Sequence, residues 1–297
     1  MSQIIELSAM LLTVALVAWG LLHRRKGGDN SIASVRQAMQ TCDLLLKLVG
    51  HMQQHRGMSS ALLAGDQSFA LRLGAKRNEI ESLFHPLHEA AMEECKQAAP
   101  CLTVNDLSVF RFKWRSLTEN LNAMTVEKSI AEHSHLVATA LDWLDALGEA
   151  RVGLAMGDRL PLGLVKNYVH RLPALTECLG QARAIGSSVA ARGKCSAVAR
   201  VRLMFLVTRA ESLLEQACAV EGAGGQGIAS KGTVHTLAEL IRGNMLGAEG
   251  VVGVTADSYF TQATRAIDGV FAWIRDCGQG LEQRLASPEG LSAVAHV

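Results

Sequence analysis

Apolar residues recur at helical spacings along most of the chain. In the segment from Ile32 to about Leu63 they include Leu45, Leu48 and Met52, which share one face of a helix with a repeat of 3.6 residues. Arg56 follows Met52 by four residues and therefore lies on the same apolar face. The pattern predicts a long helix whose one arginine in this stripe points toward the packed side.

The same periodicity predicts an all-α fold with two packed bundles of about four helices each. Glycine and proline interrupt the pattern between helices, and the strongest interruption, Gly153 to Gly163, is the predicted junction between the halves. The predicted halves are residues 31–152 and 160–286, and residues 287–297 form a tail. The Gly-Gly-Asp-Asn stretch at residues 27–30 predicts a short break before the first half. Short connections between amphipathic helices are typical of up-and-down bundles.

A nearly uninterrupted apolar run occupies residues 4–22, before these bundles. A helix of this length spans about 28 Å at ~1.5 Å per residue, close to the thickness of a bilayer core. Trp19 falls where an interfacial aromatic lies, and the basic stretch 23–26 follows at once. Residues 1–26 are thus predicted to be a single-pass anchor in the inner (cytoplasmic) membrane, with the body in the cytoplasm. The alternative, a cleaved signal peptide, lacks its basic start.

Composition and charge narrow the function classes. Apolar residues make up 49% of the 297 positions and charged residues 19%, which allows a large core. With 29 basic and 28 acidic residues the net charge is +1, and we expect no nucleic-acid partner because phosphate binding needs a basic excess. The seven cysteines show no paired spacing and indicate reduced thiols.

Two segments far apart in the chain each place one arginine among small and apolar residues. When Arg56 is aligned with Arg183, Gln54 aligns with Gln181 and Ser60 with Ser187. A buried arginine requires a partner, and its planar fork of donors matches a planar oxyanion. The alternative is that each arginine pairs with a glutamate or lies at a solvated helix edge.

Residues 53–60, Gln-Gln-His-Arg-Gly-Met-Ser-Ser, resemble the Gln-x-Glu-Arg-Gly-x-Ser signature of nitrate- and nitrite-sensing (NIT) domains. Residues 180–184, Gly-Gln-Ala-Arg-Ala, are similar to the second motif of that family, Gln-Glu-Arg-Ala. Residues 257–268 resemble its closing helix, with an aromatic residue, Ala-Thr and Ile-Asp in order. The chain departs from the family at His55 and Ala182, where the family has glutamates, and this departure suggests a more cationic site.

The resemblance implies an all-helical sensor that holds a small anion, nitrate or nitrite, between one arginine from each half. Carried over by residue, the ligand-binding candidates are two arginines with neighbouring polar donors: Arg56, Arg183, Gln54, Ser59, Ser60, Gln181 and Ser187. The short tail after residue 286 predicts that the signal passes to a separate protein or through a homodimer. The alternative function is a membrane-tethered helical adaptor without a small-molecule ligand.

No cofactor, metal site or enzymatic activity is predicted. His51 and His55 lie four residues apart on one helical face, a spacing that can bind a metal, but no third ligand is identified by the sequence. Paired catalytic carboxylates, a nucleophile motif and a nucleotide fingerprint are all missing from the sequence.

Overall fold

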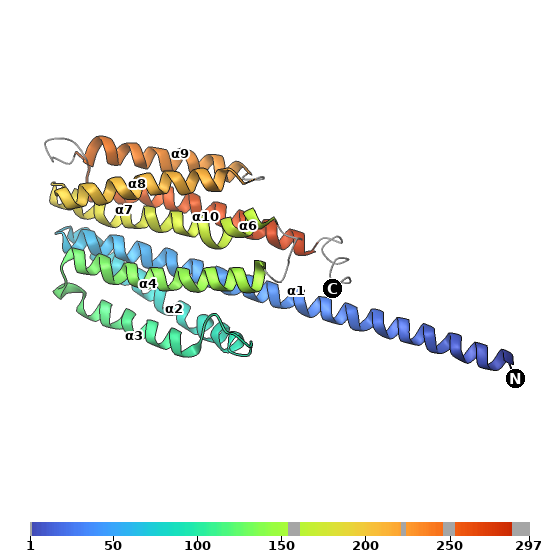
Figure 1. The fold of residues 1–297 in the computed structure, drawn as a ribbon. Coiled ribbons are helices and arrows are strands. Elements are labelled where there is room, and N and C mark those ends of the chain that lie inside the picture. The colour runs from blue at the N-terminus through green and yellow to red at the C-terminus, as the bar shows by residue number, and fades with distance from the viewer. Residues whose placement is uncertain (1, 154–160, 221–223, 246–252, 287–297) are drawn as a thin grey trace.

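The computed structural model describes the backbone of residues 2–153, 161–220, 224–245 and 253–286. Side chains are described from residue 32 onward within these ranges, residue 224 excepted. Every regular element in these ranges is helical (Figure 1), so the predicted all-α fold is confirmed.

The first half of the chain contributes four helices: α1 (Ser2–Leu63), α2 (Ala70–Glu94), α3 (Val104–Asn120) and α4 (Val126–Leu147). The second half contributes the short α6 (Leu162–Lys166) and four longer helices: α7 (Leu172–Arg192), α8 (Ala197–Cys218), α9 (Gly224–Leu240) and α10 (Ala256–Ala286). Short 3-10 turns (Gln67–Phe69, Leu121–Ala123) and π-helical segments (Gly148–Gly153, Asn167–Arg171, Ile241–Met245) complete the described elements.

Side-chain caps explain several helix boundaries. Thr103 and Asp106 form a reciprocal capping box at the start of α3, and Thr125 and Ser196 accept backbone N–H bonds at the starts of α4 and α8. Gly193 ends α7 in the left-handed conformation, with φ of 66°. Such caps satisfy backbone groups that a helix end leaves unpaired.

α1 is one continuous helix, so the break predicted at residues 27–30 is not present. Its N-terminal part projects beyond the two bundles (Figure 1). Where side chains are described, no helix is both long enough and apolar enough to cross a bilayer. The predicted inner-membrane location is therefore wrong for that part of the chain, whose helices other than the central, largely buried helix between residues 172 and 192 keep exposed polar faces. The side chains of residues 4–22, on which the anchor was predicted, lie outside this description.

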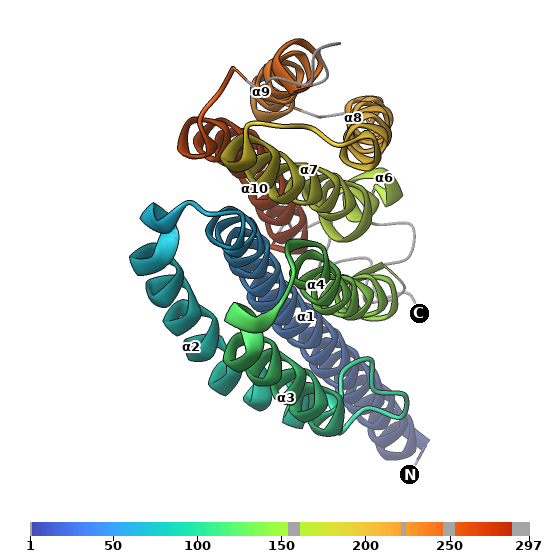
Figure 2. The same ribbon diagram turned by 90° about the vertical axis from the view of Figure 1, so that its left-hand side faces the viewer.

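The two halves meet along α1 and α7, which lie at the centre of the molecule. In Figure 2, α2 and α4 lie beside α1, with α3 packed against α2 and α4. In the other half, α8 and α10 lie beside α7, with α9 packed against α8 and α10. Buried residues of both halves, such as Met52 and Trp114 in the first and Leu175 and Trp273 in the second, belong to one continuous apolar cluster. The contact between α1 and α7 is thus part of the core.

Candidate functional site

Two glycines allow α1 and α7 to approach closely where both carry an arginine. A Cβ atom at Gly57 would lie 2.9 Å from the ring of Phe260 and 3.2 Å from Nε of Arg183, and one at Gly180 would lie 2.8 Å from Nη2 of Arg56. Each guanidinium therefore lies against a glycine of the opposite helix. Both arginine side chains have 0% exposure, so the structure brings the two predicted arginines into the interior of the protein.

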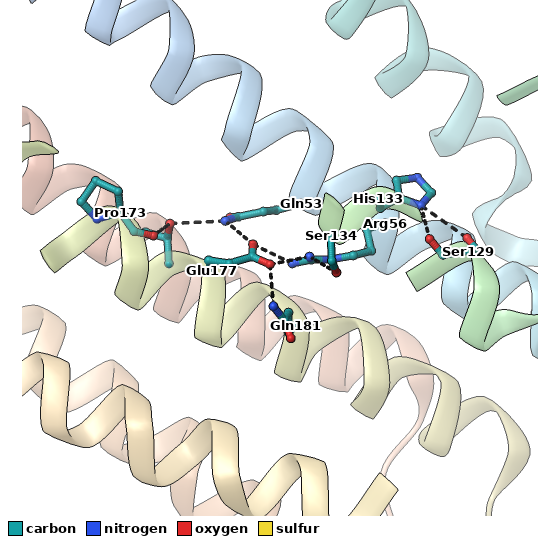
Figure 3. A network of polar contacts seen from close by, with 9 residues as sticks. Gln53, Arg56, Ser129, His133, Ser134, Pro173, Glu177 and Gln181 are labelled. Carbon is teal, nitrogen blue, oxygen red and sulfur yellow. Dashed lines mark hydrogen bonds and ion pairs between the residues drawn. The ribbon is translucent and has the colours of Figure 1, made fainter. Parts of the chain in front are cut away.

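Arg56 is held in a bidentate ion pair that connects the two halves (Figure 3). Its Nη1 and Nη2 donate to the two carboxylate oxygens of Glu177 on α7, at 2.7 and 3.0 Å, and Nη1 also donates to the hydroxyl of Ser134 on α4 at 2.8 Å. Parallel bonds of this kind are among the strongest in proteins. The alternative of a glutamate partner is therefore correct for Arg56, and the glutamate comes from the opposite half.

The carboxylate of Glu177 accepts further hydrogen bonds from two glutamines. Gln181 donates to it at 2.8 Å from the next turn of α7, and Gln53 donates at 3.1 Å from α1. Gln53 also lies 3.3 Å from the hydroxyl of Thr176 (Figure 3). Gln54, predicted for the site, instead lines a groove with Asp268 and other residues of α10. One residue along a helix rotates a side chain by about 100°, which explains why Gln53 takes the predicted place.

Arg183 has no carboxylate partner among the described residues. Its Nη1 donates to the hydroxyl of Thr264 on α10 at 2.9 Å, and its guanidinium lies 4.9 Å from the centre of the Phe260 ring. Its Nε and Nη2 are buried without a hydrogen-bond partner in the described part of the chain. Burial, together with the nearby charge of Arg56, lowers the pKa of Arg183 to about 9, although the negative charge of Asp268 opposes the change. The guanidinium remains charged at neutral pH and leaves two donors free.

The three predicted serines differ in how their hydroxyls are used. Ser60 donates to the backbone carbonyl of Arg56 at 2.8 Å, and Ser59 lies 3.3 Å from Nδ1 of His55. Ser187, one turn after Arg183 on α7, is buried with a hydroxyl that has no partner among the described residues. Ser187 is therefore the serine with an unused polar group in the described part of the site.

Sequence reasoning missed the carboxylate of this network. It noted that His55 and Ala182 stand where the family has glutamates before each arginine, and it inferred a more cationic site. The structure supplies the compensating charge from Glu177 instead. The spacing of four residues between Glu177 and Gln181 was the available signal, because it places both on one face of α7.

A buried pair of histidines adjoins Arg56. His55 Nδ1 lies 2.8 Å from His133 Nε2, and His133 Nδ1 lies 2.7 Å from the carbonyl oxygen of Ser129. Burial lowers the pKa of His133 to about 3 and holds the pKa of His55 well below its usual value. His51 contacts Lys76 instead, so the two histidines that were considered for metal binding have different partners.

The fold and this site define a class of protein: an all-helical domain in which each half contributes one buried arginine to the contact between the halves. The family profile for nitrate and nitrite sensing matches residues 47–287, and the chain belongs to this NIT family. The family description names sensing and no reaction.

Among solved structures, the chain is similar to one described as the structure of the NasR transcription antiterminator. The sequence identity is 18%, the TM-score is 0.68, and the match covers 95% of this chain and 78% of the other. This likeness shows the fold. The curated proteins compared with the chain contain no match. The absence of a nucleic-acid partner, expected from the net charge, stays a prediction.

Proposed function

We propose that this protein is a sensor that binds nitrate or nitrite at Arg183, beside the Arg56–Glu177 pair. The proposal rests chiefly on one observation: Arg183 is a fully buried cation, and two of its donors have no hydrogen-bond partner among the described residues. A buried charge without a partner costs several kcal/mol, and an anion of matching shape removes that cost. Belonging to the NIT family supports a small anion as the ligand.

The free donors of Arg183 match the geometry of a planar oxyanion. Nε and Nη2 lie on the same edge of the guanidinium and donate in parallel, so they can bind two oxygens of one nitrate. The hydroxyl of Ser187 and Nε of Arg56 are further buried donors that have no partner in the described part of the chain. Gln54, Ser59, Ser60 and Gln181 contribute less in this proposal, because three of them already have other contacts and Gln54 lies on the groove beside α10.

Glu177 competes with the ligand for the positive charge of Arg56. Both of its oxygens are bonded to Arg56, so an anion gains most from Arg183 and less from Arg56. Binding stabilises the conformation in which α1, α7 and α10 are packed together. The size of this effect equals the difference between the anion's binding free energies for this conformation and for a more open one. α1 carries Arg56 and extends beyond the bundles (Figure 1), so we infer that α1 transmits the signal to a partner protein or a second copy.

The second candidate is a helical adaptor without a small-molecule ligand. The bidentate ion pair between Arg56 and Glu177 favours it, because an arginine already bonded to a carboxylate has less need of an anion. In that case nitrate leaves the stability of the protein unchanged.

Thermal unfolding of the full chain with added anions separates the two candidates. A site filled at 100 times its dissociation constant stabilises the folded state by about 2.7 kcal/mol, which corresponds to roughly 5–10 °C for a domain of this size. We expect this shift with nitrate or nitrite, and no such shift with chloride or sulfate at equal ionic strength.

Two variants of α7 make the test specific. Arg183→Gln should lose the shift, whereas Arg192→Gln should keep it, because Arg192 lies on the same helix but is exposed and paired with Glu127. An equal shift in Arg183→Gln, or no anion-specific shift in the wild type, refutes the proposed site.

A further inference from the structure

A pocket lies in the first half of the protein, and its lining does not include Arg183. Its volume is about 630 Å³, and its lining comes from α1, α2 and the end of α3, which are seen together in Figure 2. We call it the His55 pocket; the lining residues used here are His55, Leu62, Leu73, Arg77, Thr118 and Leu121. Cavities of this size accommodate small organic molecules.

The hydrogen bonds around His55 leave its Nε2 atom as a free acceptor. The carbonyl of Ser129 can only accept, so His133 Nδ1 carries a hydrogen, and its neutral ring then accepts at Nε2. His55 Nδ1 must therefore donate to His133 at 2.8 Å, which leaves a lone pair on His55 Nε2. In the described part of the chain, the hydrogen bonds of His55 all involve Nδ1.

The His55 ring is also fixed in place. It is 1% exposed and packs edge-on against Trp114, with 4.8 Å between ring centres. Because the ring is almost fully buried and still lines the cavity, it presents one oriented acceptor to whatever occupies the pocket. Nε2 has no hydrogen-bond partner among the described residues, so a ligand in the pocket that carries a donor can pair with it.

The remaining lining adds a cation and apolar walls. Arg77 is exposed on α2 and has no hydrogen bond or ion pair with another described residue. Leu62, Leu73 and Leu121 form apolar wall, and Thr118 provides a hydroxyl oxygen. A ligand that fits all three features has a negative charge, a hydrogen-bond donor and a short aliphatic body.

We propose that the His55 pocket binds a small organic acid whose carboxylate pairs with Arg77 and whose hydroxyl or ammonium group donates to Nε2 of His55. Nitrate and nitrite carry no hydrogen to donate and are too small to contact the apolar walls, so this site differs from the one at Arg183. The inference does not depend on the proposed function, since none of its residues belongs to the Arg56–Glu177 network.

Isothermal titration of the full chain with two matched acids tests the role of His55 without changing a buried residue. The probes are 2-hydroxy-4-methylpentanoate and 4-methylpentanoate, which share the carboxylate and the aliphatic body and differ in the hydroxyl donor. We expect the hydroxy acid to bind about tenfold more tightly, as one hydrogen bond supplies. Equal affinity of the two acids, or no binding of either at about 10 mM, overturns the proposal.

Substitution of the exposed arginine tests the other end of the site. Arg77→Gln should weaken the hydroxy acid about tenfold or more, whereas Arg115→Gln, which removes an exposed charge from α3 outside the pocket, should leave its affinity unchanged. Equal effects of the two substitutions would show a general charge effect and would overturn the proposal. Nitrate stabilisation should be the same in both variants and in the wild type.

Discussion

Replacing Arg183 by methionine should stabilise the ligand-free protein and abolish its response to nitrate. The wild-type side chain is completely buried, and its Nε and Nη2 have no partner among the described residues. Methionine has a similar length, no charge and enough flexibility to fill the space. The substitution therefore removes an uncompensated charge while it keeps most of the packing.

The structure gives the expected magnitude. Each unpaired buried donor costs about 1–3 kcal/mol, and a pKa lowered from 12.5 to about 9 corresponds to roughly 5 kcal/mol against the charged form. The substitution also loses the hydrogen bond to Thr264 and the contact with the Phe260 ring, together about 2–4 kcal/mol. The net gain is on the order of 1–3 kcal/mol.

Thermal unfolding in nitrate-free buffer measures this gain as a rise of about 2–4 °C for each kcal/mol. Arg56→Met is the matched control, and it should lose about 3–5 kcal/mol because it leaves the carboxylate of Glu177 without its partner. A lower melting temperature for Arg183→Met than for the wild type, or a nitrate response that survives in it, would refute the reasoning. Opposite effects of the same substitution at the two arginines are the distinctive outcome.

Three further predictions follow from the same core. Glu177→Gln should lower the free energy of unfolding by about 3–5 kcal/mol, because it leaves Arg56 without its carboxylate partner. The same substitution should tighten nitrate binding, since the anion then compensates the charge of Arg56 as well; an unchanged affinity in calorimetry would contradict this. The pKa of His133 is lowered to about 3 in the folded protein, so the unfolded protein binds a proton at this residue at a higher pH than the folded one. The contribution of neutral His133 to stability is therefore complete above about pH 6.5, and it falls by ~1.4 kcal/mol per pH unit down to about pH 3. Urea titrations should show a shallower acid slope in His133→Asn. Gly180→Ala should lower the free energy of unfolding by about 1–3 kcal/mol, because the added Cβ forces α1 and α7 apart. Gly74→Ala, where a Cβ meets nothing within 4 Å, should raise it by about 0.5–1 kcal/mol, and equal melting temperatures of the two variants would contradict the close approach of the helices.

The all-α class and the inward position of Arg56 could be predicted from the amino-acid sequence. Local signals carry this information: the 3.6-residue period places Arg56 on the apolar face with Met52, and caps such as Thr125 mark helix ends. The same local reading failed at residues 27–30, where the glycines predicted a break and α1 continues, since the cost of a glycine in a helix is only about 1 kcal/mol. It also failed in the inner-membrane location, because no helix with described side chains is apolar enough to span a bilayer.

The balance of charges in the core depends on contacts between segments that are far apart in the chain. Glu177 compensates Arg56 from the opposite half of the chain, more than a hundred residues away, while Arg183 receives no carboxylate in the described part. The choice of Gln53 over Gln54 depends on which face of α1 meets α7, and Gly57 and Gly180 allow that meeting. These are contacts between distant segments, and periodicity along one helix carries no information about which residue of another helix lies opposite.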